Sequence, residues 1–481
     1  MRKMTSTKLA VVGAGPGGYA AAFFAADLGV DVTLIDPAPN PGGVCLYRGC
    51  IPSKALLHVA NVIQESRHAS AFGIEFGEPR IEFAKLRGWK DALVKRLTDG
   101  LGQVARQRKV KYLRGNAAIL DANTLQVDGV EDGPQRVQFE HAILATGSRP
   151  ARVHGLTLES SRVLDSSSAL ELEDVPSTLL VVGGGYIGLE LGTVYATLGS
   201  RVTIVEMTSG LLPGADRDLV VPVARRMGHL CEAVLLETRV VALEEDGPGI
   251  AVTLEGAKVS EPRQVFDKVL ISVGRVPNSN IPGLENTRVK VGPGGFIEVD
   301  AQRRTAEPSI FAIGDVVGEP MLAHKASHEA RVAVEATMGG ATVFAPAAIP
   351  AVVFTDPELA WCGLTEQQAR SEGRRIEVAR FPWAASGRSV TLDRTDGVTK
   401  LIVDPDTERV LGVGMTGPGA GELVAEGVLA IEMGATASDL KRTIHPHPTL
   451  SETIMESAEV FFGQSTHVYK PRKQPAEISK I

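Results

Sequence analysis

Two cysteines, Cys45 and Cys50, lie close together in the stretch GGVCLYRGCIPSKALLH (residues 42–58) of this 481-residue chain. Four residues separate them, whereas thioredoxin-like redox motifs have about two between their cysteines. Zinc-binding pairs are usually separated by about two to four residues and need a second pair elsewhere. The chain has four cysteines in all, which is too few for a disulfide-stabilised scaffold. The pair therefore indicates thiol chemistry, with two buried apolar thiols as the alternative.

The residues after the pair predict a helix that positions one of the thiols. The segment IPSKALLHVANVIQESRHA predicts a helix that begins near Ile51, and Pro52 suits its first turn because that turn needs no N–H there. Cys50 is then expected at the helix N-terminus, where the partial positive charge favours a thiolate. Cys45 is expected in the preceding loop, within reach of Cys50 if the loop folds back. Lys54 lies four residues after Cys50, on the same helical face.

A second group of reactive residues lies near the C-terminus, in HPHPTLSE (residues 445–452). His445 and His447 each precede a proline, which keeps both out of a helix interior. A histidine can take the proton of a thiol and return it, and the thiolate is the nucleophile. Glu452 follows His447 by five residues. Thr449 and Glu452 have the spacing of a capping box at the start of TLSETIMESAEVFF, which is compatible with a further role for Glu452. His445 is expected to be structural.

The elements that must position these groups contain an internal repeat. The segments KLAVVGAGPGGYAAAFFAADLGVDVTLIDP (8–37) and TLLVVGGGYIGLELGTVYATLGSRVTIVEM (178–207) are offset by 170 positions throughout. Each predicts a strand, a glycine-rich turn, a helix, a second strand and then an acid. The glycines are Gly13, Gly15 and Gly18 in the first copy and Gly183, Gly185 and Gly188 in the second, and the acids are Asp36 and Glu206.

This pattern is typical of dinucleotide binding. The first glycine makes a tight turn, the second lets the backbone approach a pyrophosphate, and the third lets helix and strand pack closely. The helix N-terminus attracts the pyrophosphate, and the acid binds ribose hydroxyls. Two copies predict two dinucleotides. No Arg or Lys follows Glu206 in EMTSGLLP, so the second site is expected to prefer NAD over NADP. The alternative is that Glu206 only caps its strand.

Three further segments predict buried strands that end in turns. HAILATGSRP (141–150) and KVLISVGRVPN (268–278) end in glycine turns at Gly147 and Gly274. SIFAIGDVVG (309–318) ends at Gly314 and Asp315. Ligands of open α/β sheets bind at the carboxyl ends of the strands, so Asp315 is a candidate ligand contact. It could equally be an ordinary turn residue.

Together, these motifs resemble the flavin-dependent pyridine nucleotide-disulfide oxidoreductases. The likeness runs from Lys8 to about Gly463 and is carried by GAGPGGYAAAFFAADLG, GGVCLYRGCIPSKALL, ATGSRP, GGGYIGLELG, FAIGDV, MLAHKASHE, FPWAASGR and HPHPTLSE. It implies FAD in the first site and NAD in the second. It also implies that Asp36 holds the FAD adenosine ribose, that Asp315 lies by the ribityl chain, and that Gly147, Gly274 and Ala323 lie at the cofactors.

The resemblance also implies roles for the reactive residues. Cys45 would exchange with the substrate and Cys50 would face the flavin. Lys54 would lie near the flavin N5 and pair with Glu190. His447 would be the general base, oriented by Glu452. The chain would be an obligate homodimer, in which the C-terminal domain lends its histidine motif to the disulfide of the other subunit.

The implied fold is α/β, with two Rossmann-like dinucleotide-binding domains and a C-terminal α+β dimerisation domain. The expected divisions are an FAD-binding domain (first part) at 1–150, an NAD-binding domain at 151–280, a central domain completing the FAD site at 281–350, and an interface domain at 351–481.

Within this family, the motifs are most similar to those of the enzymes that oxidise protein-bound dihydrolipoamide. Lipoyl domains of a 2-oxo-acid dehydrogenase or glycine cleavage complex are therefore the expected partners. The alternatives are a disulfide reductase of the glutathione or mercuric type, or a flavoprotein kept for binding in a complex. The first would need NADP-binding arginines after the second strand, and the mercuric type would need cysteines in the tail VYKPRKQPAEISKI. The loop CLYRGC departs from the family, which usually has Asn-Val where Tyr47 and Arg48 stand.

Composition excludes several other classes. The net charge is −7 and the chain has no basic tract, which argues against a nucleic-acid partner. No apolar run reaches about 18 residues, so no membrane span is expected. The N-terminus MRKMTSTKLAVVGAG does not resemble a signal peptide, which favours the cytoplasm. No metal site is expected.

Overall fold

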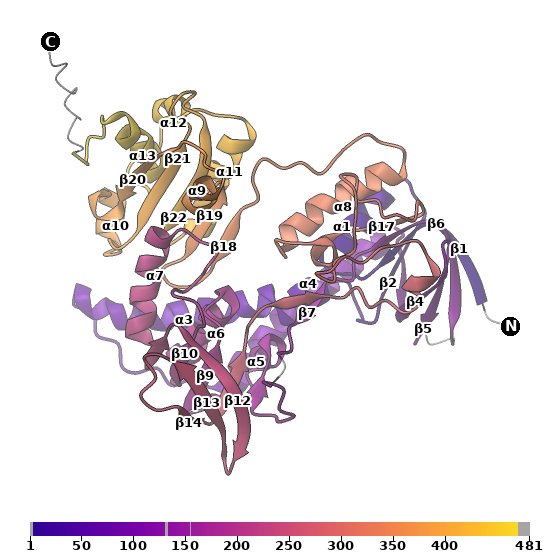
Figure 1. Cartoon of the computed structure of the whole chain (residues 1–481), viewed down its shortest axis with the longest axis horizontal. Helices are drawn as coiled ribbons and strands as arrows, with labels where there is room; N and C mark the ends of the chain where they lie inside the picture. The colour runs from indigo at the N-terminus through magenta and orange to yellow at the C-terminus, as the bar shows by residue number, and fades with distance from the viewer. Residues whose placement is uncertain (1–2, 130–132, 154, 470–481) are drawn as a thin grey trace. The chain divides into compact units, whose positions relative to one another are not determined.

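The computed structural model describes residues 3–129, 133–153 and 155–469. It divides into two compact units, which are described separately (Figure 1). Unit 1 comprises Met1–Gly183, Thr197–Arg201 and Arg239–Ala345, and unit 2 comprises Gly184–Ala196, Val202–Thr238 and Pro346–Ile481. None of the helices in the described part of the chain is long and apolar enough to cross a membrane.

The main sheet of unit 1 has seven strands in the order β3-β2-β1-β6-β5-β4, with β17 pairing β6. Its strands are β1 (Lys3–Val12), β2 (Val32–Asp36), β3 (Lys111–Arg114), β4 (Asn116–Asp121), β5 (Thr124–Asp128), β6 (Gln135–Leu144) and β17 (Ile310–Ala312). The pairs that involve β1, β2, β3 and β17 are parallel, and β4, β5 and β6 are antiparallel. The apolar run of residues 9–12 is buried, as expected for a strand covered on both faces.

Helices cover this sheet. In unit 1 they are α1 (Pro16–Asp27), α2 (Gly43–Arg48), α3 (Cys50–His68), η1 (Ala69–Phe72), α4 (Phe83–Gln107), α5 (Ser166–Glu171), η2 (Leu284–Asn286), η3 (Gly314–Val317) and α8 (Ala323–Thr337). Helix α1 packs against α8. The side chains between them are small, because Ala21, Ala22 and Ala25 of α1 share a buried core with Ala330 and Ala333 of α8. Small residues at this interface let the two helices approach closely.

Smaller ladders complete unit 1. Strands β8 (Val163–Leu164), β9 (Thr178–Val182) and β15 (Lys268–Ile271) pair in parallel. Strands β12 (Thr238–Asp246), β13 (Gly249–Gly256) and β14 (Arg263–Phe266) form a three-stranded sheet. Strands β7 (Ser148–Pro150) and β16 (Arg275–Pro277) pair antiparallel, so the two predicted glycine-turn segments lie side by side.

Unit 2 contains the second nucleotide-type helix and a five-stranded antiparallel sheet in the order β18-β19-β22-β21-β20. The five strands of this sheet are β18 (Ala351–Val353), β19 (Leu359–Gly363), β20 (Glu377–Pro382), β21 (Val398–Val403) and β22 (Val410–Thr416). Unit 2 also contains the strands β10 (Arg201–Val205) and β11 (Ala233–Leu235). Its helices are α6 (Tyr186–Leu198), α7 (Arg217–Leu230), α9 (Glu366–Ser371), η4 (Trp383–Ala385), α10 (Gly387–Thr391), α11 (Ala420–Glu432), α12 (Ala437–Arg442) and α13 (Glu452–Phe462).

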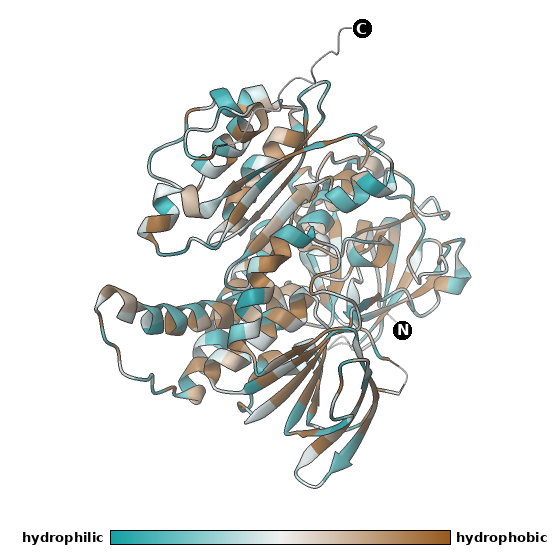
Figure 2. Ribbon diagram, turned by 60° about the vertical axis from the view of Figure 1, so that its left-hand side comes forward, coloured by the Kyte–Doolittle hydropathy of each residue, from teal (hydrophilic) through white to brown (hydrophobic). Residues whose placement is uncertain are grey.

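The five-stranded sheet of unit 2 is covered on both faces. Helix α11 approaches Val413 of β22 through Gly427, whereas the next residue, Gly414, lies against Leu219 of α7. Successive residues of a strand point to opposite faces, so α11 and α7 lie on opposite sides of the sheet. Hydrophobic residues run along the strands in Figure 2, while the helices alternate between hydrophobic and hydrophilic residues. The predicted α/β class with a C-terminal α+β part is confirmed.

Candidate active site

The two cysteines lie on two consecutive helices, α2 and α3. Cys50 is the first residue of α3, as predicted, but Cys45 lies in helix α2 and the predicted loop is wrong. Gly49 lies between the two helices, and its backbone conformation is not helical. A Cβ on Gly49 would lie 2.9 Å from the Val44 carbonyl oxygen, so the turn needs glycine there. The break at Gly49 folds α2 back and brings the two cysteines together.

The cysteine thiols interact directly. The Cys45 and Cys50 side chains share a hydrogen bond, with Cys45 half-buried and Cys50 exposed. This hydrogen bond, together with burial, raises the pKa of Cys45 far above its ordinary value. The raised pKa favours the protonated thiol at Cys45. Burial and the charges of both cysteines also raise the pKa of Tyr19 in α1, which lies beside the pair.

The unusual Tyr47 of the redox loop has a structural role. Its hydroxyl donates to the Asn40 carbonyl oxygen at 3.0 Å and accepts the Asn40 N–H at 3.3 Å. The Asn40 side chain in turn donates to Asp99 of α4 at 3.0 Å. Tyr47 thus links α2 to the segment that follows β2. Arg48, the last residue of α2, is exposed.

The Lys54 and Glu190 side chains lie in different units. Lys54 is half-buried in α3 of unit 1. Glu190 is only 3% exposed in α6 of unit 2, where its carboxylate accepts the Phe354 N–H at 3.1 Å. The pairing of Lys54 with Glu190 stays a prediction.

The first glycine loop has the geometry expected of a pyrophosphate site. Gly13 has a φ of +97°, and a Cβ there would overlap the Ala145 carbonyl oxygen. A Cβ on Gly18 would overlap the Gly13 carbonyl oxygen, so the first and third glycines are required by packing. At Gly15, the N-cap of α1, a Cβ would have its nearest neighbour 3.9 Å away, and the backbone is open. The open second glycine fits the approach of a ligand phosphate.

The second loop repeats this arrangement. Gly183 has a φ of +111°, and a Cβ there would lie 2.5 Å from the Ser272 carbonyl oxygen. Gly185 has no atom within 4 Å of its Cβ position. Gly188 is buried in α6. The second loop therefore also leaves its middle glycine open toward a ligand.

The two acids of the repeat make matching hydrogen bonds. Asp36 accepts the Ala14 N–H at 2.7 Å and the Ala38 N–H at 2.9 Å. Glu206 accepts the Gly184 N–H at 2.7 Å and the Thr208 N–H at 2.7 Å. Each acid thus holds the glycine loop of its own motif. Each carboxylate oxygen keeps a further lone pair that can accept a ribose hydroxyl.

The nearest arginine after Glu206 is fully engaged elsewhere. Arg217 donates to the carbonyl oxygens of Leu211 at 2.7 Å and Ala215 at 2.5 Å, and it also bonds the Leu212 carbonyl. Burial lowers the pKa of Arg217. Its guanidinium is occupied by backbone carbonyls, which favours a second site without a partner for a 2′-phosphate.

Asp315 lies in η3, where its carboxylate accepts the Ser148 hydroxyl at 2.5 Å. Ser148 in turn accepts from the Arg275 guanidinium at 2.7 Å, so β7 and β16 orient the acid. Asp315 is therefore a turn residue, and its carboxylate is also held in one orientation. The glycines before these strands, Gly147 and Gly274, have φ values of +68° and +119° and nothing within 4 Å of their Cβ positions.

Sequence reasoning missed two residues that hold the Asp315 turn. Glu329 of α8, which is fully buried, accepts the Gly314 N–H at 2.6 Å. Lys325, also buried, donates to the Gly318 carbonyl oxygen at 2.9 Å and lies 3.3 Å from Glu329. Ala323 begins this helix. In MLAHKASHE the lysine and the glutamate have the four-residue spacing of an ordinary surface ion pair, so nothing in the sequence signals that they are buried.

The histidine motif contains a preformed His–Glu pair. The Nδ1 atom of His447 lies 2.9 Å from Glu452 Oε1, and the Thr449 N–H donates to Oε2 at 2.8 Å. Burial would raise the pKa of Glu452, but the Thr449 N–H and the His447 ring hold it below its ordinary value. The His447 side chain is 74% exposed.

The predicted start of the following helix is wrong by two residues, because the N-cap of α13 is Ser451 and not Thr449. The Thr449 hydroxyl donates to the Pro446 carbonyl oxygen at 2.7 Å instead of capping the helix. Half of the predicted capping box remains, in the bond from the Thr449 N–H to Glu452.

His445 differs from His447 in its surroundings. Its Nε2 lies 2.8 Å from Glu426, its Nδ1 lies 3.0 Å from the Thr443 carbonyl oxygen, and its side chain is 5% exposed. Both ring nitrogens are engaged within the chain, so His445 has no nitrogen left for a substrate.

Comparison with known families agrees with this geometry. Residues 7–330 match the family described as pyridine nucleotide-disulphide oxidoreductase, and residues 349–458 match its dimerisation domain. The second match supports a homodimer.

Curated relatives match along nearly the whole chain. A dihydrolipoyl dehydrogenase from Vibrio cholerae is 48% identical over 466 residues, which cover 97% of this chain and 98% of the relative. A dihydrolipoyl dehydrogenase from Haemophilus influenzae is 47% identical over 479 residues and covers 100% of both chains.

Solved structures with the same fold include LpdA from Mycobacterium tuberculosis, with a TM-score of 0.86 and 25% identity over 94% of this chain and 99% of that one. The HOCl-induced flavoprotein disulfide reductase RclA from Escherichia coli has a TM-score of 0.82 and 27% identity, over 93% of this chain and 98% of that one.

Proposed function

Because the chain belongs to the pyridine nucleotide-disulphide oxidoreductase family, we propose that it oxidises protein-bound dihydrolipoamide to lipoamide, with FAD as its flavin and NAD as the final electron acceptor. The observation that carries this proposal is the 48% identity over 97% of the chain to a relative named dihydrolipoyl dehydrogenase. The paired thiols and the His–Glu pair supply the groups that the reaction needs.

The cofactor assignments follow the two glycine loops. FAD is assigned to the loop of Gly13, Gly15 and Gly18 with Asp36, and NAD to the loop of Gly183, Gly185 and Gly188 with Glu206. The open second glycines, each at the start of a helix, fit a pyrophosphate in both loops. FAD, when bound, accepts the electron pair of the reduced thiols and makes it available to NAD. Asp315, oriented by Ser148, serves the sugar chain of the flavin, near Gly147, Gly274 and Ala323.

The protein's own residues carry out the thiol exchange. The cycle starts from the oxidised chain, in which Cys45 and Cys50 form a disulfide. His447 of the partner subunit takes a proton from one substrate thiol, and the thiolate attacks Cys45. The Cys45–Cys50 bond breaks and Cys50 leaves as a thiolate, favoured by its place at the N-terminus of α3.

A second exchange completes the substrate oxidation. The second substrate thiol attacks the mixed disulfide, which closes the lipoyl ring and releases Cys45. The products are lipoamide, a Cys45 thiol and a Cys50 thiolate, so the two electrons of the substrate now reside on the cysteine pair. The shared hydrogen bond between the two thiols stabilises this reduced form. Lys54 and Glu190 are assigned to the flavin side of the pair.

The partner assignments rest on exposed groups. Leu429 and Met433 of α11 and the nearby Ile444 are exposed hydrophobic residues, which suit a surface covered by a second copy of the chain. The exposed His447 is then available to the disulfide of that copy. The dihydrolipoyl group comes from the lipoyl domain of another chain. Cys231 and Cys362 are buried free thiols, which suits the reducing cytoplasm that we assign as the location.

We assign the same segments to the domains as above: residues 1–150 and 281–350 to FAD, 151–280 to NAD, and 351–481 to the dimer interface. The family match to residues 7–330 and the dimerisation match to residues 349–458 support this order along the chain.

The test is a Cys50→Ser variant of the flavin-loaded protein. It should keep its yellow flavin but lose turnover of dihydrolipoamide, because the cysteine pair can no longer form a disulfide. Cys231→Ser, a buried cysteine away from the redox motif, is the matched control and should keep turnover. Full turnover by Cys50→Ser would refute the mechanism. Rates of the unmodified protein with glutathione and with NADP decide between the proposed function and a glutathione-type reductase.

A further inference from the structure

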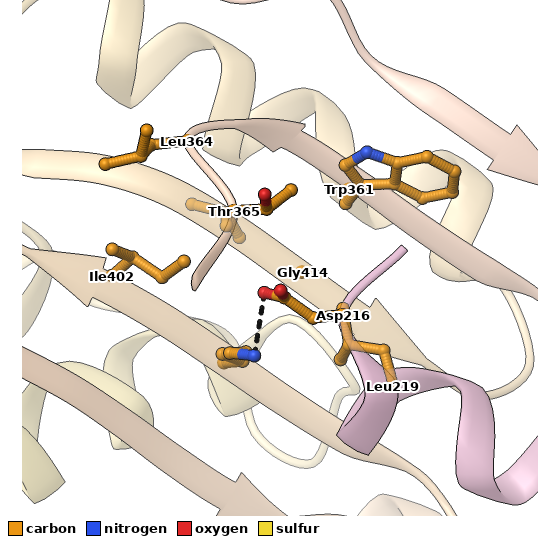
Figure 3. Close-up of a pocket in the computed structure, with 9 residues that line it drawn as sticks. Asp216, Leu219, Trp361, Leu364, Thr365, Ile402 and Gly414 are labelled. Carbon is orange, nitrogen blue, oxygen red and sulfur yellow. Dashed lines mark hydrogen bonds and ion pairs between the residues drawn. The ribbon is translucent and has the colours of Figure 1, made fainter. Parts of the chain in front are cut away.

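Unit 2 contains a buried lysine that contacts three carboxylates. Lys400 of β21 is 1% exposed, and its Nζ lies 2.8 Å from Asp216, 2.7 Å from Asp218 and 2.5 Å from Glu366. Figure 3 shows Asp216 directed at this ammonium from the segment before α7. Oxygens of the three acids lie within 4.8 Å of one another, and the ammonium of Lys400 provides the cation among them.

Stability alone is a weak reason for this network. Taking an ammonium and carboxylates out of water is expensive, and well-packed apolar residues often serve as well or better. The network is also rich in acid: Arg380 adds a second cation through bonds to Asp218 and Glu366, against three carboxylates. Lys400 and Arg380 overcome the effect of burial and hold the pKa of Asp218 below its ordinary value. Buried ion pairs are best known for fixing one packing arrangement over others.

Asp216 gives up its local role to join this network. It occupies the N-cap position of α7, yet its side chain makes no capping bond to that helix. The carboxylate instead accepts the N–H of Glu366 at 3.0 and 3.1 Å and binds Lys400. An N-cap acid normally satisfies the free N–H groups of its own helix. The start of α7 is therefore fixed by the sheet of unit 2 instead of by local capping.

From Asp216, contacts continue to the second glycine loop. The next residue, Arg217, turns back and binds the carbonyls of Leu211 and Leu212. The Leu212 N–H donates to the Gly184 carbonyl oxygen at 3.0 Å, and a Cβ on Gly184 would lie 2.7 Å from the Leu211 side chain. The segment between Glu206 and α7 thus packs directly behind the loop that is assigned to NAD.

The opposite face of β21 contacts α13, the helix that begins at Glu452. Thr399 and Lys400 are neighbours on the strand, so their side chains point to opposite faces. The Thr399 hydroxyl donates to Thr453 of α13 at 2.8 Å, one residue after Glu452. Removing the Lys400 ammonium therefore weakens the attachment of the start of α7 to the sheet and leaves the α13 contact in place.

We propose that Lys400 is a positioning residue for the second dinucleotide site, acting through Asp216 and Arg217 on the segment behind Gly184. This role rests on the proposed function, because NAD is assigned to that loop. Loss of the lysine should let the start of α7 shift and weaken NAD binding, without slowing the exchange between dithiol and cysteine pair.

The test measures NAD binding to the flavin-loaded protein by calorimetry, together with the rate at which dihydrolipoamide reduces the flavin before NAD is added. Lys400→Met keeps an unbranched side chain that is only one atom shorter and removes its charge. It should weaken NAD binding about tenfold, within the usual range of coupling between separated sites, and leave the flavin reduction rate unchanged. Asp216→Asn should weaken NAD binding in the same direction. Lys400→Arg, which keeps the charge, should restore much of the affinity.

Arg380→Met is the matched control, because it removes a cation from the same network without touching Asp216. It should leave NAD affinity within about twofold of the unmodified protein, the spread expected when no interaction with the site is lost. Equal NAD affinity in Lys400→Met and the unmodified protein would overturn the inference while leaving the proposed function intact. An equal loss of affinity in Arg380→Met would also overturn it, because the effect would then be general destabilisation. If the unmodified protein bound no NAD, the proposed function itself would fail.

Discussion

Replacing Glu452 with glutamine should disable His447, the proposed general base, while the histidine itself stays in place. The carboxylate has two acceptor oxygens, one for the His447 ring and one for the Thr449 N–H. Because a carboxylate donates no proton, Nδ1 of His447 must carry the hydrogen, and Nε2 is free to accept a proton from a thiol. Glutamine has one oxygen, which the Thr449 N–H needs. Its NH₂ group then faces Nδ1 and forces the hydrogen onto Nε2, the wrong nitrogen for a base.

Two effects set the size of the loss. The first is the attraction between carboxylate and imidazolium, which at about 4 Å is worth about 1 kcal/mol in water and about 4 kcal/mol at an effective dielectric of about 20. The lower figure suits a ring that is 74% exposed, and the higher one suits a ring enclosed by a partner subunit. The second is the wrong tautomer. Together they predict a fall of about 10²-fold in kcat/KM for dihydrolipoamide, below the about 10⁴-fold upper limit for losing a general base.

The assay is the initial rate of NADH formation from dihydrolipoamide and NAD. Glu426→Gln is the matched control, because Glu426 makes the equivalent bond to the structural His445. Its kcat/KM should stay within about twofold of the unmodified enzyme, the spread expected of a change that removes no catalytic contact. Glu452→Gln should also keep its flavin. If Glu452→Gln kept unmodified kcat/KM, or if both variants lost activity equally, the proposed role of the His447–Glu452 pair would be wrong.

Two further predictions concern the glycine loop and acid stability. Gly18→Ala should prevent folding of the first unit and so abolish flavin retention, because its Cβ would overlap the Gly13 carbonyl, whereas Gly15→Ala should fold and only weaken FAD binding. Flavin fluorescence after gel filtration and thermal unfolding distinguish these two outcomes. Equal behaviour of the two variants would contradict the packing argument. Because the folded pKa of Asp218 is lowered, its contribution to stability is present above its unfolded value of about 3.9 and is lost as pH falls through the folded value. The free energy of unfolding, measured in urea between about pH 5 and pH 2, should therefore fall less steeply with decreasing pH in Asp218→Asn than in the unmodified protein. Identical pH profiles of the two proteins would contradict this role of Asp218.

The sequence was most informative where a short pattern has one structural solution. The glycine spacing, the strand before it and the acid after it predicted both loops, because each feature depends on residues close in the chain. The start of α3 at Cys50 was predictable for the same reason, since Pro52 favours the first turn of a helix. The helix that carries Cys45 was not, because six residues between glycines are too few to show a helical period.

Contacts between distant segments were beyond sequence reasoning. Lys400 and Asp216 are 184 positions apart, and each taken alone reads as an exposed charge. Lys325 and Glu329 read as an ordinary surface pair on α8, although both are buried against the Gly314 turn. Nothing local distinguishes a charge that will be buried from one that will face water. The hydrogen bond from the Tyr47 hydroxyl to the Asn40 carbonyl oxygen could not be predicted from the sequence either.

The cover over the first glycine helix has a consequence for how long each dinucleotide stays bound. Both loops are held in shape by their own acids, so neither must be ordered when a ligand arrives. The start of α1 is nevertheless enclosed by α8, since the Ser327 hydroxyl donates to the Pro16 carbonyl oxygen and Ala326 closes over Gly17. At the start of α6, Tyr186 is 40% exposed. The contacts of α8 with Pro16 and Gly17 therefore restrict access to the start of α1. If FAD and NAD bind these loops as proposed, we expect the dinucleotide of the first loop to exchange more slowly than that of the second.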